Sequence, residues 1–475
     1  MTDKTLQKTN YGALTMLTTV FFFWGFVAAS NTILIGLFKE KFDLLQWQSQ
    51  LVEFAFYTAY FVGSLIYFLL STFGKDPLQK YGSKKGLIGG LLISAVGAIG
   101  FVPAAELGSF WLMLFSLFTV GIGFSLLQIV ANPYVIALGD SKTGAHRVSL
   151  AGGVNSIGTM LGPIIFNSLI FGKVSGSDTN NVTIASVELP YIILTICFVA
   201  LAFILSRAKL PNLNSSKIEE EDTVSTNESK SVFKYPQLVL GMIAIFVYVG
   251  VEVSIQSNLP SLMEQSNILG MKPEHTAQYI SLYWGSLMIG RWLQSIGVFT
   301  VSGRKKIITQ FIVAFIAFGV IIGSNWLMGT DVTNFFQYWP FVVLLIITLI
   351  ATRDKTGLSL IVFSLLGLIM MVFGMFTEGF TAVLFFVSGG LFCSIMWPCI
   401  FSLSIAGLGK QTTKGSSLLV MMIFGGAIIP PLQGYLGDEI GIHNSYWLPV
   451  LCFAYLAFFA WFVGKTLKKQ GVEIE

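Results

Sequence analysis

The chain has 475 residues, of which 54% are hydrophobic and only 11% are charged, and its net charge is +4. Soluble globular domains carry about 25% charged residues. So much apolar surface cannot be enclosed in one core, so the composition excludes an ordinary soluble protein and predicts an all-α integral membrane protein. No zinc, catalytic-triad or phosphate-loop pattern occurs. We therefore expect no enzyme activity, no cofactor and no nucleic-acid partner.

Apolar runs long enough to cross a bilayer as helices, about 18–26 residues each, follow one another along the chain. A polar stretch with few apolar residues at 207–235 predicts a cytoplasmic linker. It separates an N-terminal six-helix bundle at 1–206 from a C-terminal bundle at 236–475. The predicted helices before the linker lie at 12–38, 48–72, 86–103, 110–138, 147–171 and 188–206. Those after it lie at 236–262, 277–299, 305–327, 335–352, 357–376, 379–408, 415–435 and 445–464.

The two runs within 335–376 exceed a pattern of six helices on each side of the linker. We expect them to be an inserted helix pair, giving twelve plus two helices; a partly interfacial segment is the alternative. Loop charges support the count, because a cytoplasmic N-terminus leaves only four of the 28 Lys and Arg in outside loops. Both termini are thus expected to be cytoplasmic, in a multi-pass protein of the cell inner membrane. The four outside residues are Lys39, Lys41, Lys173 and Lys272.

The two halves of the chain repeat each other. Gly25 precedes Asn31 by six residues, and Gly250 precedes Gln256 by the same interval. Gly-rich helices then end in Gly-Pro at 162–163 and in Pro-Pro at 430–431. A parallel repeat of six-helix units with pseudo-two-fold symmetry is the layout of transporters of the major facilitator type, in which the substrate binds at the midplane between the halves.

An acid, Glu252, lies near the middle of the 236–262 run. A charge at that depth costs roughly 2.5–3.5 kcal/mol on insertion scales, so it should face a protein interior or a wet cavity. Gln256 shares its helix face, because the two residues are four apart. Glu53 lies nearer the outer end of its helix. Two roles are equally compatible with that position: lining an outer vestibule without a part in coupling, or coupling an ion. Arg291, before a cytoplasmic loop, is expected to be a cytoplasmic gate or a snorkelling side chain rather than a ligand.

Amides both donate and accept hydrogen bonds, and aromatic rings stack on the C–H faces of sugars. This mixture suits a neutral sugar better than an ion. Amides in membrane helices also bond only to neighbouring helices, so a structural role stays open for Asn132 and Asn155. The expected substrate-binding residues are Asn31, Gln128, Asn132, Asn155, Glu252, Gln256, Trp284 and Trp397.

Several stretches in both halves resemble the fucose–galactose–glucose:proton symporter family of the major facilitator superfamily. Residues 249–254 and 425–433 look most like its glucose/galactose branch. The 335–376 pair departs from the usual twelve-helix pattern of the family. The matching stretches are Phe23-Trp-Gly-Phe26, Ala55-Phe-Tyr57, Ala131-Asn-Pro133, Asn155-Ser156, Tyr248-Val-Gly250, Trp397-Pro398, Gly415-Ser-Ser417 and Gly425–Pro430.

The resemblance implies proton-carrying acids in the first and fourth helices, but the matching positions here are Thr32 and Gln128. Neither side chain titrates. Three possibilities follow: Glu252 or Glu53 titrates instead, Na+ replaces the proton, or transport is uncoupled. The residues considered for ion coupling are therefore Glu252, Glu53 and Thr32. For Na+ the neutral oxygens of Asn31, Thr32 and Gln128 with the Glu252 carboxylate are a candidate ligand set.

Together these observations predict a secondary transporter that imports a hexose of the glucose/galactose type by alternating access, coupled to Na+ or H+. The alternatives are an uncoupled sugar uniporter and an exporter of a lipophilic, drug-like substrate. The expected partners are a small-molecule sugar and the lipid bilayer, and the expected state is a monomer.

Overall fold

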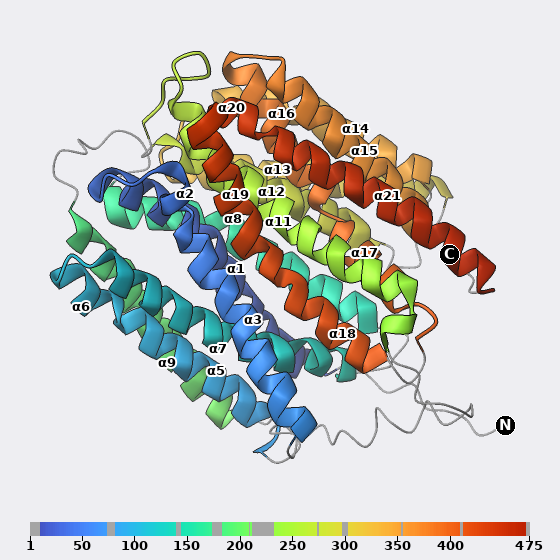
Figure 1. Ribbon diagram of the computed structural model, residues 1–475, viewed down its shortest axis with the longest axis horizontal. Helices are drawn as coiled ribbons and strands as arrows, with labels where there is room; N and C mark the ends of the chain where they lie inside the picture. Colours follow the sequence, from blue (N-terminus) through green and yellow to red (C-terminus); the bar gives the residue numbers. More distant parts are fainter. Residues whose placement is uncertain are drawn as a thin grey trace.

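The computed structural model describes residues 10–73, 81–138, 144–172, 183–208, 210, 232–272, 275–296, 303–352, 355–408 and 412–471. Within these ranges every regular element is a helix. Figure 1 shows the long helices running in one general direction through a single bundle. Most of the predicted linker lies outside the described residues.

The helices before the linker begin and end close to their predicted positions. Helix α1 packs along α8, α5 packs on α7 and α9, and α3 packs on α7. The elements are α1 (Tyr11–Lys41), α2 (Gln46–Ser49), α3 (Leu51–Phe73), α5 (Ser83–Ile99), α6 (Phe101–Glu106), α7 (Phe110–Ala137), α8 (Gly144–Phe171), η3 (Ile184–Val187) and α9 (Glu188–Arg207).

After the linker, helix α11 is central and contacts α16, α17, α19 and α21. Helix α12 packs between α13 and α16. The elements are η5 (Val232–Lys234), α11 (Pro236–Glu264), α12 (Ala277–Ser295), α13 (Gly303–Leu327), η8 (Thr333–Tyr338), α14 (Trp339–Thr352), α15 (Thr356–Met375), α16 (Gly379–Cys393), α17 (Met396–Ile405), α18 (Thr412–Met421), η10 (Met422–Phe424), α19 (Gly425–Ile440), α20 (Ile442–Ser445) and α21 (Trp447–Lys469).

The inserted pair is a pair of separate helices, α14 and α15. Helix α15 packs on α16 and α21, and α14 packs on α13, α15 and α16. Twelve segments of the described chain are long and apolar enough to cross a membrane, and the two inserted helices are among them. Helices α3, of 23 residues, and α12, of 19, run beside these twelve. The layout of twelve plus two helices is therefore the one observed.

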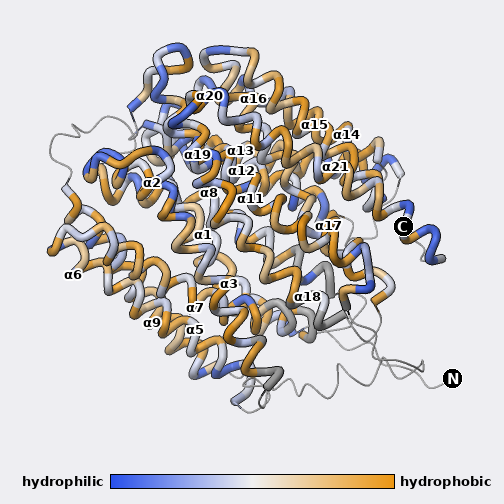
Figure 2. The backbone as a smooth tube through the Cα atoms, viewed as in Figure 1, coloured by the Kyte–Doolittle hydropathy of each residue, from blue (hydrophilic) through white to orange (hydrophobic). Residues whose placement is uncertain are grey.

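The outer surface of the bundle suits lipid. Figure 2 shows hydrophobic residues along the length of most helices, with hydrophilic residues concentrated towards the helix ends. Large apolar side chains are exposed on α9 and α13, among them Ile196, Phe203, Ile308 and Phe315. A bilayer satisfies such a surface, because its core is as apolar as these side chains. The chain is therefore a multi-pass membrane protein.

The direction of helices α1 and α11 distinguishes the two ends of the bundle. Helices α1 and α11 end together, since Lys39 near the end of α1 pairs with Glu264 at the end of α11. We call this the distal end, and the end at which α1 and α11 begin the proximal end. Short helix α2 lies at the distal end beside α19 (Figure 1).

Glycines bring α1 and α8 into backbone contact. A Cβ atom at Gly158 would clash with the carbonyl oxygen of Phe22, and one at Gly162 would clash with that of Phe26. From the opposite helix, a Cβ at Gly25 would clash with the carbonyl oxygen of Asn155. Small residues allow such close helix crossings in membranes. The crossing fixes Asn155 firmly against α1.

Candidate functional site

Helix α11 meets helices from the first half of the chain, and among its buried polar residues are the two singled out from the sequence, Glu252 and Gln256. Glu252 is 8% exposed and Gln256 is fully buried. As predicted, they lie one turn apart on the same helix. Their side chains nevertheless engage different helices, so Glu252 and Gln256 belong to two separate clusters of buried polar groups.

The first cluster contains an ion pair. Arg291 Nη2 of α12 lies 3.4 Å from Glu252 Oε1. The other guanidinium nitrogen, Nη1, donates to Ser156 Oγ at 3.0 Å and to Asn155 Oδ1 at 3.5 Å on α8. The hydroxyl of Tyr283 donates to the Glu252 carbonyl oxygen at 2.7 Å. Arg291 thus balances the charge of Glu252 and also links the two halves of the chain.

Sequence reasoning missed this pair, although a signal for it was present. Arg291 is the one basic residue that lies away from the ends of a predicted span, and Glu252 is an acid in the adjacent span. Opposite charges within membrane helices usually pair with each other. The expectation of a gate is therefore incomplete, because Arg291 also contacts Glu252 directly.

The second cluster lies closer to the distal end. The Thr32 hydroxyl of α1 donates to Gln256 Oε1. Gln256 Nε2 donates to Glu53 Oε1 at 3.3 Å, and Asn31 Nδ2 donates to Glu53 Oε2 at 3.5 Å. All four residues are at most 1% exposed. The carboxylate of Glu53 is therefore enclosed between α1, α3 and α11 rather than open to a vestibule.

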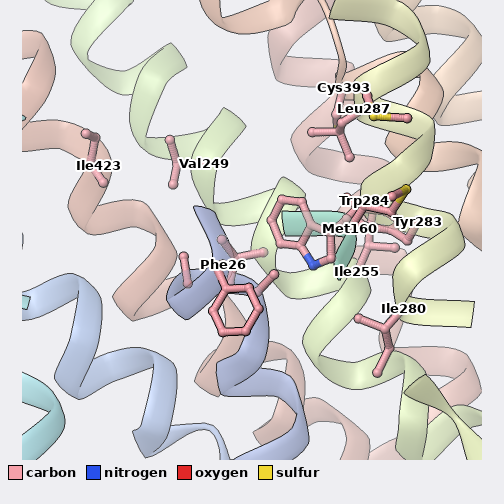
Figure 3. Packing of buried hydrophobic residues seen from close by; sticks show 14 of the residues in the cluster. Phe26, Met160, Val249, Ile255, Ile280, Tyr283, Trp284, Leu287, Cys393 and Ile423 are labelled. Atoms are coloured by element: carbon pink, nitrogen blue, oxygen red, sulfur yellow. The ribbon is translucent and has the colours of Figure 1, made fainter. Parts of the chain in front are cut away.

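Several buried polar atoms beside these clusters have no hydrogen-bond partner among the described residues, and Asn31 Oδ1 and Trp284 Nε1 are two of them. Figure 3 shows the indole of Trp284 directed towards Phe26 of α1. Buried polar groups in proteins are normally hydrogen-bonded. One acceptor and one donor are therefore available for water or a hydroxylated ligand between the halves.

The remaining predicted residues lie in three different settings. Gln128 lines a small void of about 10 Å³ with Trp24 and Ala131, away from α11. Trp397 is half-buried, and its ring lies 6.3 Å from that of Tyr248. Asn155 also donates from Nδ2 to the Phe21 carbonyl oxygen at 2.8 Å, so it has the interhelical bond that was left open. The side chain of Asn132 lies outside what the structure describes.

The residues considered for Na+ divide between separate places. Asn31 and Thr32 belong to the Glu53 cluster. Glu252 pairs with Arg291, and Gln128 lines its own void. Within the described ranges no hydrogen bond or ion pair joins Glu252 or Gln128 to Asn31 or Thr32. If these oxygens hold a cation, Glu53 is the acid placed to complete the site.

Side chains of both halves close the distal end. Gln46 Nε2 donates to Asn258 Oδ1 at 3.0 Å, and Ser261 Oγ donates to Gln46 Oε1 at 2.7 Å. Gln50 Nε2 donates to the Ser257 carbonyl oxygen at 3.2 Å. We call these contacts, with those of Asp438 described next, the distal seal. They join α2, and Gln50 between α2 and α3, to the last turns of α11.

Asp438 of α19 completes the distal seal. Its two carboxylate oxygens accept the backbone N–H groups of Gln46 and Trp47, each at 3.0 Å. Gly434, one turn earlier, lies so close to α2 that an added Cβ would be 3.0 Å from Trp47 Cα. These contacts cover the distal side of Glu53, which explains why an acid near a helix end is fully buried.

Comparison with known proteins places these features in a family. A profile of the Major Facilitator Superfamily matches residues 13–353. A glucose/galactose transporter of Brucella abortus (strain 9-941) is 34% identical over 466 residues, which is 98% of this chain and 97% of the relative. A putative glucose/galactose transporter of Helicobacter pylori (strain ATCC 700392 / 26695) is also 34% identical, over 96% of this chain and 98% of its own.

A second group of relatives transports a different sugar. The L-fucose-proton symporter of Escherichia coli (strain K12) is 28% identical over 95% of this chain and 93% of its own. A crystal structure of the E. coli fucose:proton symporter matches with a TM-score of 0.62 and 25% identity, covering 96% of this chain and 99% of that one. The resemblance and the fold class inferred from the sequence motifs are confirmed.

Proposed function

Because the chain belongs to the Major Facilitator Superfamily, and so is a membrane transporter rather than an enzyme, we propose that it imports a neutral hexose by alternating access. The two bundles, 1–206 and 236–475, are joined by the linker at 207–235 and rock against each other. We call the interface between them along α11 the seam. The observation that carries the proposal is the convergence of buried polar side chains from both bundles on this seam. A hydrophilic solute needs such groups to replace its water in the membrane.

The charge balance of the site favours an uncharged substrate. Arg291 neutralises Glu252, so their cluster presents hydrogen-bonding groups without a net charge. Asn31 Oδ1 and Trp284 Nε1 offer a free acceptor and a free donor for sugar hydroxyls. The names of the relatives from Brucella and Helicobacter support a hexose of the glucose/galactose type.

We assign ion coupling to Glu53. Its carboxylate has amide partners, and no cationic side chain pairs with it among the described residues. A buried carboxylate of this kind is costly unless a cation neutralises it. The amides of Asn31 and Gln256 can present N–H to a free carboxylate and, after rotation, oxygen to a proton or a Na+ ion. The name of the fucose relative supports the proton.

The distal seal acts in this proposal as the outer gate. With both termini cytoplasmic, as the loop charges predict, the distal end faces outside the cell. A hexose then enters when the bonds of Gln46, Gln50 and Asp438 to the other bundle break. The seal covers Glu53, so opening it exposes the coupling acid to the outside.

The test is uptake by purified protein in liposomes under separately imposed Na+ and H+ gradients. Labelled glucose, galactose, fucose and N-acetylglucosamine are compared. We expect glucose or galactose to accumulate above equilibrium with one gradient. Glu53→Gln should equilibrate the sugar without accumulating it, while Glu40→Gln, an exposed acid at the end of α1, should behave as wild type.

Other outcomes contradict parts of the proposal. Full accumulation by Glu53→Gln would remove Glu53 from coupling. Wild-type equilibration that neither gradient drives would identify a uniporter. Absence of sugar uptake together with resistance to lipophilic compounds would identify the exporter alternative.

A further inference from the structure

We propose that Arg291 is a specificity-determining residue: by balancing Glu252, it keeps the site neutral and so excludes amino sugars and sugar acids. This inference rests on the proposed function of hexose transport. It concerns selectivity, whereas Glu53 concerns coupling.

The geometry fixes Arg291 at the seam. Its guanidinium contacts Glu252 at 3.4 Å on one side and Ser156 at 3.0 Å on the other. The preceding Gly290 packs so closely on Ser394 that a Cβ there would clash with the serine side chain. The backbone of α12 is therefore held at this point. This fixed backbone places the Arg291 side chain within reach of both Glu252 and Ser156.

Glu252 in turn has no second cationic partner among the described residues. The Tyr283 hydroxyl donates to the backbone carbonyl of Glu252, and the Tyr248 hydroxyl lies near its side chain; neither hydroxyl is a cation that could balance the carboxylate. Glu53 is the other acid at the seam, and its charge is taken up by the coupling ion. The net charge that a bound sugar meets thus depends on Arg291.

An unpaired charge changes selectivity in a direction set by its sign. At about 6 Å and an effective dielectric constant of about 20, one unit charge alters the affinity of a singly charged ligand by about a hundredfold, and by about tenfold at roughly twice that distance. Loss of Arg291 leaves a negative site, which should favour a protonated amino sugar. Loss of Glu252 leaves a positive site, which should favour a sugar carboxylate.

A gate alone predicts a different result. If Arg291 only closed the proximal side through Ser156 and Asn155, its loss would change the uptake rate of every sugar by a similar factor. A specificity role changes the ratios between sugars. The two roles therefore differ in selectivity rather than in rate.

The experiment measures competition against labelled galactose by glucose, glucosamine and glucuronate in liposomes, at a pH where the glucosamine amine is protonated. Arg291→Gln should raise the preference for glucosamine over glucose by about tenfold or more. Glu252→Gln should raise the preference for glucuronate by a similar factor. The double variant should regain the wild-type ratios, with weaker apparent affinity. Arg304→Gln, which removes an exposed charge at the start of α13, should leave all ratios unchanged.

The double variant keeps the test decisive if a single variant does not fold, because it carries no unpaired charge. Folding is checked by a monodisperse profile in detergent. Unchanged ratios in folded single variants would overturn the inference, and so would a folded double variant that takes up no hexose or prefers a charged one. Failure of the proposed function looks different, since the wild-type protein itself would then take up no hexose.

Discussion

Replacing Gly434 by alanine should loosen the distal seal. The added Cβ would lie 3.0 Å from Trp47 Cα and 3.1 Å from both Gln46 O and Trp47 N, all backbone atoms of α2. Ordinary contact begins near 3.4 Å, so α2 must withdraw by about 0.4 Å relative to α19. Because Asp438 lies one turn further along α19, its two 3.0 Å bonds to α2 should lengthen to about 3.4 Å.

The magnitude follows from those two bonds. A hydrogen bond to a charged group contributes about 1.5–3 kcal/mol, so weakening a pair of them should cost the closed state about 1 kcal/mol. That is roughly a fivefold increase in the population with an open distal end. Gly434→Val should have a larger effect, because its side chain is bulkier at the same contact.

The assay is the rate at which a membrane-impermeant maleimide labels a cysteine introduced by Ser257→Cys, with the four native cysteines replaced by serine. Ser257 is fully buried in the distal seal. Gly434→Ala should speed labelling by roughly fivefold. Gly464→Ala, at a helical position with open space around it, should not change the rate. An unchanged or slower rate in both Gly434 variants would refute the reasoning.

Two further predictions use other contacts. Gly158→Ala should destabilise the protein by about 1–3 kcal/mol, because a Cβ there clashes with the α1 backbone; thermal unfolding in detergent measures this, and an equal effect from Gly152→Ala, which has open space, would contradict it. Lys39→Met should alter Ser257→Cys labelling by no more than about fivefold, because the Lys39–Glu264 pair is partly exposed and such pairs contribute about 0–1 kcal/mol. A larger change would assign Lys39 a dominant role in the seal.

The helices could be predicted from the sequence because a single physical requirement, satisfying the backbone in lipid, sets their length and apolarity. Even the inserted pair, α14 and α15, followed from that requirement. The shared helix face of Glu252 and Gln256 was also accessible, since helical spacing is local. What spacing could not supply was the partner of each side chain.

Those partners come from distant parts of the chain. Gln256 meets Glu53 and Thr32, which are 203 and 224 residues away, so only the packing of the two halves brings them together. From the sequence, Glu53 was placed near a solvent-exposed helix end, because the residues around it give no sign that α2 and α19 cover it. The resemblance pointed to positions 32 and 128, yet Gln128 lies apart from the α11 clusters and Glu53 is the acid beside Thr32.

The single helical turn between Glu252 and Gln256 has a consequence for how strictly the proposed transporter would move one ion with each sugar. One turn of helix rises about 5.4 Å, so Glu252, which pairs with Arg291, and Gln256, which donates to Glu53, are attached to the same short piece of rigid backbone. Any displacement of that piece reaches both sites within one motion. In the transport mechanism proposed above, this shared backbone should tie movement of the ion to movement of the sugar, so leak of either alone should be small.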